Sequence, residues 1–326
     1  MDTPNFLSTS LHIMSCVEVP VHIFGAYCIL CKTPITMKSV KWSMLNLHFW
    51  SVFLDLTISI LVIPYILFPA VVGRSLGLLE FVKVPQKLQL YLIVSLFPTV
   101  GVSITTLLEN RYYLMFARFR RWKYFRTPFL TSLYLASAFC FLPSYLMIPE
   151  QEAALAEVLE GIPELREYIK DFDFLVLSSD SYGFFLTLII LITLVTATSL
   201  TFAWLLHANI RDRAGNNASK RTVQLQQIFF RAILIQTSMP ICVLILPCSY
   251  LAFSMFTGYF NQAANNLSFI ITAFHGIFST VVMIMVHKPY RIVVNFKIYR
   301  KLQILWGVDS QEHRSTFSLA TISKSH

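Results

Sequence analysis

The sequence has few charged residues. Only 13% of its 326 residues are Asp, Glu, Lys or Arg, whereas 56% are hydrophobic. A typical soluble domain carries about 25% charged residues, so the charge available here is too small to cover a globular surface. This argues against a soluble enzyme built around one core. The net charge of +9 would indicate nucleic-acid binding only on a soluble fold with a basic face, and we therefore expect no nucleic-acid partner.

Sequence motifs of catalysis are missing as well. The chain contains no G-x-x-x-x-G-K-[ST], no H-E-x-x-H and no G-x-S-x-G. Asp55 is the only Asp inside a long apolar stretch, whereas an intramembrane aspartyl enzyme needs two facing carboxylates. The six cysteines lie almost all in apolar runs, which indicates small, buried, reduced side chains. We predict a protein that is not an enzyme and has no cofactor and no bound metal.

Long apolar stretches are abundant instead. A bilayer core of about 30 Å needs about 20 mostly apolar residues in a helix. Seven stretches qualify, which predicts an all-α membrane protein, a seven-transmembrane helix bundle. No basic residue precedes Lys32, so we expect no cleaved signal peptide and count the first stretch as a span. The expected spans are residues 11–31, 44–69, 88–110, 128–148, 182–207, 230–254 and 267–287.

The distribution of charge predicts the orientation. Of the 26 Lys and Arg residues, 21 fall on one side, in loops 32–41, 111–126 and 211–231 and after residue 287. By the positive-inside rule this side is cytoplasmic, and residues 1–10 are extracellular. Loop 150–180 on the outer side has nine acidic residues and two basic ones. Its apolar residues recur at helical spacing, so two interpretations stay open: a short amphipathic helix over the bundle mouth, or a solvated acidic loop.

The segment after Pro289 is apolar but is not a span. Residues 288–306 place apolar side chains on one arc of a helical wheel and Lys297, Arg300 and Lys301 on the opposite arc. This pattern predicts an interfacial amphipathic helix whose cations face anionic membrane lipid. Residues 307–326 are rich in Ser and Thr and are predicted to be a disordered cytoplasmic tail.

Ionisable and kinked positions inside the spans indicate where function could reside. Asp55 near mid-membrane is either an inward-facing switch between two bundle states or a carboxylate that holds helices together, with Glu18 as a candidate partner. His275 either meets a ligand or is a hydrogen-bonded core histidine. Pro240 and Pro247, seven residues apart in the sixth span, predict a hinge or a static kink.

The third span ends in Glu109-Asn110-Arg111-Tyr112. Its position resembles that of the Asp/Glu-Arg-Tyr motif of G-protein-coupled receptors, with Asn110 inserted. The resemblance implies that Glu109 restrains the arginine at rest and that Arg111 contacts a heterotrimeric G protein. The insertion rotates Arg111 by 100°. We therefore hypothesise that Glu109 contacts Arg231, at the start of the sixth span, instead.

Further motifs resemble nematode serpentine chemoreceptors of class H. They are Leu45-Asn46-Leu47-His48-Phe49-Trp50 with Asp55-Leu56 and Pro64-Tyr65, Thr222 to Phe230 with Ile235-Gln236 and Pro240, and Phe274-His275-Gly276 with His287-Lys288-Pro289-Tyr290-Arg291. The resemblance runs from about residue 10 to residue 305. It implies a receptor of chemosensory neurons, in the cilium of the cell, that detects small molecules and signals through a heterotrimeric G protein.

The ligand is expected to enter from outside, between the third, fifth, sixth and seventh spans. Candidate lining residues, selected for depth and type, are Gln89, Tyr91, Tyr182, Phe185, Tyr250 and His275. An apolar pocket with few polar groups suits a volatile or lipid-like small molecule. Three alternatives stay open. The first is a transporter, against which the lack of an internal repeat argues. The second is a ligand-gated channel subunit, which the orientation derived from the charges disfavours, and the third is a receptor-like protein that no longer couples to a G protein.

Overall fold

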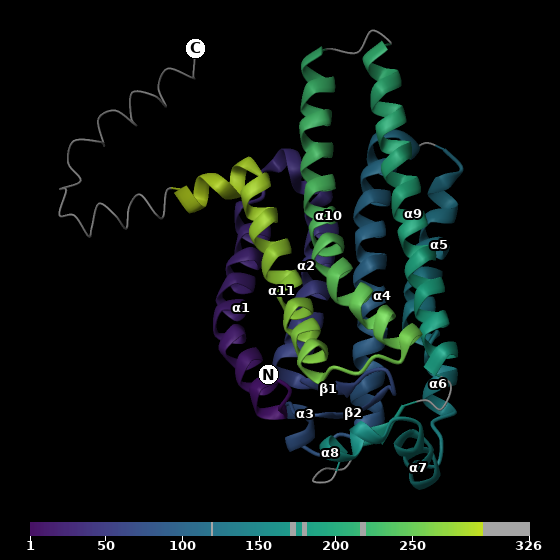
Figure 1. The fold of residues 1–326 in the computed structure, drawn as a ribbon. Helices are drawn as coiled ribbons and strands as arrows, with labels where there is room; N and C mark the ends of the chain where they lie inside the picture. The colour runs from purple at the N-terminus through teal and green to yellow at the C-terminus, as the bar shows by residue number, and fades with distance from the viewer. Residues whose placement is uncertain (119, 170–173, 178–180, 216–219, 296–326) are drawn as a thin grey trace, which may run out of the picture.

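The computed structural model describes residues 1–118, 120–169, 174–177, 181–215 and 220–295, and within them seven helices are long and apolar enough to cross a membrane. They run side by side as a bundle (Figure 1), which confirms the predicted fold class. The helices are α1 (Pro4–Lys32), α2 (Lys38–Leu56) with its π-helical extension η2 (Thr57–Leu61), α4 (Gln86–Tyr112) with η3 (Tyr113–Ala117), α5 (Trp122–Phe139), α9 (Ser181–Gly215), α10 (Lys220–Thr257) and α11 (Gln262–Val286).

Short elements connect the long helices. They are η1 (Ile35–Met37), α3 (Leu78–Phe81), α6 (Leu142–Leu146), α7 (Gln151–Gly161), η4 (Pro163–Leu165), α8 (Arg166–Ile169) and the strands β1 (Pro64–Leu67), β2 (Val72–Ser75) and β3 (Leu175–Val176). We call the end of the bundle that carries the N-terminus, α7 and the strands the acidic end. The opposite end, with residues 32–41 and 111–126, is the basic end (Figure 1).

Local sequence signals set the ends of the helices. Thr3 caps α1 by accepting a hydrogen bond from the amide of Phe6, and Pro4 occupies the first turn, where its missing N–H is not needed. Asn261 caps α11 in the same way, through the amide of Ala264. These caps explain why α1 and α11 begin several residues before the predicted spans at 11 and 267.

The second span is shorter than the predicted 44–69, because the helix ends at Leu61. Ile63 takes a positive φ of 48°, and Pro64 then opens β1. Proline has no amide hydrogen to donate into a continuing helix, so the chain leaves the bundle and turns into a strand. β1 pairs antiparallel with β2, with Pro64 opposite Ser75, and β2 pairs with β3, with Val72 opposite Val176.

This sheet closes the acidic end of the bundle. Gln262 and Asn265, in the first turn of α11, donate side-chain hydrogen bonds to the carbonyls of Ile66 and Phe68. Residues of α7 pack on the same hydrophobic cluster as the strands. Of the two interpretations of loop 150–180, the structure supports the short helix over the mouth. The acidic end is therefore covered by packed structure.

After α11 the chain turns at His287, and residues 288–295 are again helical. In Figure 1 this yellow segment leaves the axis of α11 at the basic end. The rest of the predicted interfacial helix, residues 296–306, and the predicted tail 307–326 lie outside the described residues.

Three hydrophobic clusters fill the described bundle: one toward each end, and a smaller one where α4 packs on α5 and α9. On α1 the cluster at the acidic end finishes at Met14, and the cluster at the basic end begins at Cys28. On α11 the corresponding residues are Ala273 and Met283. The predicted burial of the cysteines is correct only for Cys28: all six are free thiols, and the other five face partly or fully outward, where the helices are apolar on their outer surfaces too.

Candidate functional site

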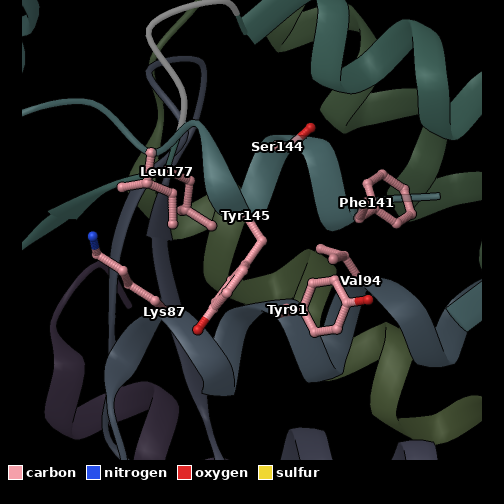
Figure 2. A pocket seen from close by; sticks show the side chains of 8 residues that line it. Lys87, Tyr91, Val94, Phe141, Ser144, Tyr145 and Leu177 are labelled. Carbon is pink, nitrogen blue, oxygen red and sulfur yellow. The ribbon is translucent and has the colours of Figure 1, made fainter. Parts of the chain in front are cut away.

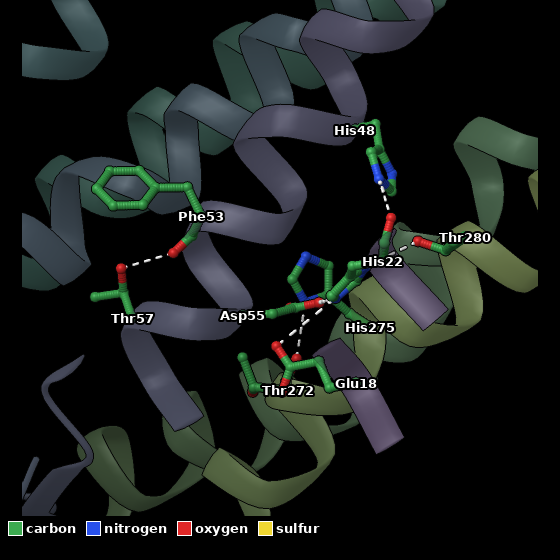
Figure 3. A network of polar contacts seen from close by, with 9 residues as sticks. All are labelled: Glu18, His22, His48, Phe53, Asp55, Thr57, Thr272, His275 and Thr280. Atoms are coloured by element: carbon green, nitrogen blue, oxygen red, sulfur yellow. Dashed lines mark hydrogen bonds and ion pairs between the residues drawn. The ribbon is translucent and has the colours of Figure 1, made fainter. Parts of the chain in front are cut away.

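A layer of polar side chains lies between the two end clusters, at mid-height of the bundle. Figure 3 shows its polar contacts. The layer comes from α1, α2 and α11, and all its members are buried. Burying polar groups costs free energy unless they find partners, so the contacts within this layer decide whether it stabilises the bundle. We call it the central cluster: Glu18, His22, His48, Asp55, His275 and Thr280.

Asp55 is the centre of this layer. Its Oδ2 accepts a hydrogen bond from His22 Nε2 at 3.0 Å, and its Oδ1 lies 2.7 Å from His275 Nδ1. Asp55 and His275 are fully buried, and His22 is 4% exposed. The carboxylate therefore links the histidine of α1 to the histidine of α11, which explains why a charged side chain is tolerated at this depth.

Further contacts to a hydroxyl group and to backbone carbonyls hold the three imidazole rings in place. His22 Nδ1 lies 3.1 Å from the hydroxyl of Thr280. His48 Nε2 donates to the carbonyl of His22 at 3.0 Å. His275 Nδ1 also lies 2.9 Å from the carbonyl of Thr272, so one N–H faces two acceptors. The rings of His22 and His275 are thus each held by two contacts, and the ring of His48 by one contact to α1.

Glu18 is the least satisfied member of the cluster. It lies one helical turn before His22, and its Oε1 is 3.7 Å from His22 Nε2, too long for a hydrogen bond. Both of its oxygens are buried, and neither has a hydrogen-bond partner in the described part of the chain. A carboxylate in this state requires a neutralising group.

Two glycines allow the helices to come this close. A Cβ at Gly276 would lie 1.7 Å from Asp55 Oδ2, and a Cβ at Gly25 would lie 2.5 Å from Cγ2 of Thr280. Small residues permit close approach of membrane helices. The central cluster therefore depends on glycine at both positions, because a Cβ would collide with Asp55 at Gly276 and with Thr280 at Gly25.

A cavity of about 490 Å³ lies between α2, α4 and α5, toward the acidic end. Leu88 and Phe139 on its wall are 46% and 56% exposed, so it opens on the side of the bundle. Most of the wall is apolar, but two buried polar atoms on it, Gln89 Oε1 and Ser95 Oγ, have no hydrogen-bond partner within the described residues. Its lining residues are Trp50, Phe53, Leu79, Val84, Leu88, Gln89, Tyr91, Leu92, Ser95, Leu96, Thr99, Ala138 and Phe139.

A second, much smaller pocket adjoins it between α4 and α6 (Figure 2). Its volume is about 20 Å³, which is room for a single water molecule. The rings of Tyr91 and Tyr145 lie 5.3 Å apart across it. The hydroxyl of Tyr91 donates to the carbonyl of Ala138 on α5. This pocket is too small for an organic ligand, so the larger cavity is the candidate site.

The basic end contains a buried ion pair between α4 and α5. Glu109 Oε2 lies 2.9 Å from Arg126 Nη2, and its Oε1 accepts a hydrogen bond from Trp122 Nε1 at 2.7 Å. Glu109 is fully buried, whereas Arg126 is 22% exposed. Asn110, the next residue, donates to Ser43 Oγ on α2 at 2.6 Å. The end of α4 is thereby tied to α2 and α5.

Arg111 turns to a third helix. Its guanidinium carbon lies 3.9 Å from the centre of the Phe229 ring on α10, in the geometry of a cation–π contact. The same ring packs on His287, whose Nε2 donates to Gln236 Oε1 at 3.1 Å. Burial lowers the pKa of His287 to about 4, so this imidazole is neutral at physiological pH.

Comparison with known proteins decides the family. Residues 2–300 match the family model described as serpentine type 7TM GPCR chemoreceptor Srh. The chain belongs to the Srh family of serpentine chemoreceptors. It is 27% identical over 307 residues to serpentine receptor class H-72 of Caenorhabditis elegans, covering 88% of this chain and 84% of the relative. The crystal structure of squid rhodopsin aligns with a TM-score of 0.52 at 10% identity, over 94% and 88% of the two chains, and so shares the fold.

The Srh match confirms the resemblance drawn from the motifs, and the seven spanning helices make the receptor a multi-pass membrane protein. The predicted ligand residues do not gather at one pocket. Gln89 and Tyr91 line the cavity between α2, α4 and α5, whereas Tyr250 Oη donates to the carbonyl of Asn261 and His275 lies in the central cluster. The side chains of Tyr182, Phe185 and Pro240 lie outside the described part of the receptor.

The hypothesised contact between Glu109 and Arg231 is wrong for the described structure. Arg231 is exposed, and Arg126 of α5 takes the place proposed for it. Glu109 does not pair with Arg111 either, because residues two apart on a helix do not face each other. Pro247 is buried within α10, which continues from Lys220 to Thr257 through both prolines; whether it acts as a hinge stays a prediction.

Several residues of the receptor's site were not singled out from the sequence. His22, His48 and Thr280 complete the central cluster, and Trp122, Arg126 and Phe229 complete the basic end. A signal was available for one of them: Glu18 and His22 are four residues apart, the spacing of neighbours on a helix face. The others come from different helices, whose facing sides the sequence does not reveal.

Proposed function

We propose that this receptor binds a small, mainly apolar molecule in the cavity between α2, α4 and α5 and activates a heterotrimeric G protein from its basic end. The cavity carries the proposal. Its volume of about 490 Å³ lies within the range of small-molecule sites, and its wall is apolar with a few polar groups. The unpartnered Gln89 Oε1 is an acceptor and Ser95 Oγ can donate or accept, so the ligand that fits carries a hydroxyl or similar donor on an apolar body.

The side opening supports an apolar ligand. Leu88 and Phe139 at the cavity wall are exposed on the bundle surface, which faces acyl chains in a bilayer. The acidic end, by contrast, is covered by the sheet and α7. A volatile or lipid-like molecule would partition into the bilayer and enter between helices. This differs from the entry route expected from the sequence, between the third, fifth, sixth and seventh spans.

The basic end is the proposed coupling surface. The sequence assigns 21 of the 26 basic residues to the loops and the C-terminal segment on this side, so by the positive-inside rule the basic end faces the cytoplasm and the N-terminus lies outside. Arg111 is stacked on Phe229 and Glu109 is paired with Arg126. Both contacts restrain α4 against neighbouring helices. An agonist acts only if it binds better to the bundle state in which such contacts are changed, and release of Arg111 would present it to the G protein. By family resemblance the setting is the cilium of a sensory neuron.

The test uses G-protein dissociation sensors for the main Gα classes in cells that express the receptor. The probes are a panel of volatile aliphatic alcohols and ketones. Leu92→Trp fills the cavity, and Leu194→Trp, at an exposed position of α9, is the matched control. We expect an alcohol of the panel to activate the wild type and the control but not Leu92→Trp. A response retained by Leu92→Trp would contradict binding in this cavity, and a wild type silent to the whole panel would contradict the proposed ligand class.

A further inference from the structure

The central cluster contains one carboxylate that its described neighbours leave without a hydrogen bond. Two carboxylates, Glu18 and Asp55, are fully buried at mid-membrane, and neither oxygen of Glu18 has a hydrogen-bond partner within the described residues. His22 Nε2 is shared between them, at 3.0 Å from Asp55 Oδ2 and 3.7 Å from Glu18 Oε1. One N–H cannot serve both. Buried polar atoms without a partner are rare in native proteins and call for an explanation, and a bound ion is one of them.

The spacing of these atoms fits a metal ion. The ligand atoms of Glu18, His22 and Asp55 all lie within 4.8 Å of one another. Zn–N and Zn–O bonds of about 2.0–2.2 Å in a tetrahedral site put ligand atoms about 3.3 Å apart. The separations of His22 Nε2 from Asp55 Oδ2 and from Glu18 Oε1, 3.0 and 3.7 Å, bracket that value. Small side-chain rotations would therefore bring all three atoms to one ion.

The surroundings of the ligand atoms are those of a supported metal site. A metal-binding histidine carries its proton on the other ring nitrogen and donates it to a fixed acceptor; His22 Nδ1 lies 3.1 Å from Thr280 Oγ1. Ligating carboxylates are likewise held by hydrogen-bonding groups, and His275 Nδ1 lies 2.7 Å from Asp55 Oδ1. His275 Nε2 is buried without a partner among the described residues, a further polar atom in the cluster available to an ion or its water.

The donor set selects the type of metal. Calcium takes six to eight oxygen ligands and magnesium near-octahedral oxygen geometry, whereas one imidazole and two carboxylates suit zinc. Three protein ligands leave a fourth position open, as in zinc sites that bind water or a ligand. The ion's charge of +2 also equals the summed charge of the two carboxylates.

We propose that Glu18, His22 and Asp55 form a zinc-binding site that joins α1 to α2, with Thr280 and His275 of α11 as supporting residues. A cavity of about 250 Å³ between α1 and α2 reaches His22 and His48 from the side. The site is separate from the cavity proposed for the organic ligand, which lies between α2, α4 and α5. Zinc binding would therefore be retained by a receptor in which the ligand cavity is filled.

The experiment measures zinc in full-length receptor purified into lipid nanodiscs. Bound metal is counted by mass spectrometry, and melting temperature is recorded after treatment with a membrane-permeable chelator and after zinc is restored. We expect one zinc per receptor and a melting temperature that falls with the chelator and recovers with zinc. Glu18→Gln and Asp55→Asn, which keep the shape of the side chain, should lose the ion and the response to the chelator.

Two further variants separate the metal site from general stability. His12→Ala changes an exposed histidine of the same helix and should bind zinc as the wild type does. Thr280→Val removes the partner of His22 and should weaken zinc binding about 10–100-fold, which keeps the test valid if a carboxylate variant does not fold. A wild type without zinc, equal binding by Glu18→Gln, or stabilisation by sodium but not by zinc would overturn the proposal.

Discussion

Gly276 offers the sharpest test of the geometry of the central cluster. In Gly276→Ala the added Cβ would lie 1.7 Å from Asp55 Oδ2, 2.6 Å from its Cγ and 3.0 Å from its Oδ1. An ordinary contact is at least 3.4 Å, so the carboxylate or the α11 backbone must move by about 1.7 Å. Asp55 cannot move that far without losing its contacts to His22 and His275, which are only 3.0 and 2.7 Å long.

The cost follows from these two effects. Overpacking a filled interior costs typically 1–3 kcal/mol, and breaking a buried ion pair costs about 3–5 kcal/mol. Because the second effect replaces part of the first, we expect a loss of roughly 3–5 kcal/mol. At about 2 °C per kcal/mol this is a fall of roughly 6–10 °C in apparent melting temperature. Fluorescence-detected size-exclusion chromatography of heated, tagged receptor measures it.

A matched glycine and a double variant complete the test. Gly161 ends α7, and a Cβ there meets no atom within 4 Å, so Gly161→Ala should leave the melting temperature unchanged or slightly raised. In an Asp55→Ala background the clash is gone, so adding Gly276→Ala should cost little further. Wild-type stability of Gly276→Ala, or the same loss with and without Asp55, would refute the close approach of α2 and α11.

Two more predictions concern the basic end. Phe229→Ala removes the ring on which the Arg111 guanidinium is stacked. Since a cation–π contact contributes about 0.5–2 kcal/mol, we expect basal G-protein activation to rise several-fold. The control Phe253→Ala, at an exposed position of the same helix, should leave basal activation unchanged. An unchanged basal signal in Phe229→Ala would count against the restraint. For His287, the unfolded imidazole binds a proton below pH 6.5 but the folded one only below about 4, so stability falls as pH drops through this window. At pH 5 the loss is about 2 kcal/mol, which is about 4 °C in melting temperature at about 2 °C per kcal/mol. The difference in melting temperature between wild type and His287→Gln should therefore change by about 4 °C between pH 7.5 and pH 5. A difference that does not depend on pH would contradict a neutral, buried His287.

The fold was predictable because the lengths of apolar stretches and the positions of charged residues can be counted along the chain. Seven apolar stretches gave seven spanning helices, and the depth of Asp55 along its helix predicted a buried carboxylate in a polar network. The end of α2 was missed, because Val62 and Ile63 are as apolar as the helix before them. Only the positive φ of Ile63 and the strand pairing that begins at Pro64 show that the chain leaves the helix there.

The candidate sites were less predictable, because they depend on which side of each helix faces which neighbour. Asp55 meets His22 and His275, which are 33 and 220 residues away along the chain. Depth and residue type placed Tyr250 in a ligand pocket, but its hydroxyl is bound to the carbonyl of Asn261. The expectation that no metal is bound rested on the cysteines and on the missing H-E-x-x-H motif. The proposed ligands Glu18 and His22 have the spacing of neighbours on one helix face, but Asp55 comes from another span, which the sequence does not place beside them.

The inserted Asn110 shows how one residue changes the contacts at the end of a helix. An α-helix turns 100° per residue, so Glu109 and Arg111 point about 200° apart and cannot restrain each other. Glu109 instead meets Arg126 on α5, Asn110 meets Ser43 on α2, and Arg111 meets Phe229 on α10. Three consecutive residues thus bind three different helices. The contacts of these residues therefore run between helices and not within α4. If the proposed ligand moves α2 or α5, which line its cavity together with α4, we expect the movement to reach the segment that carries Arg111.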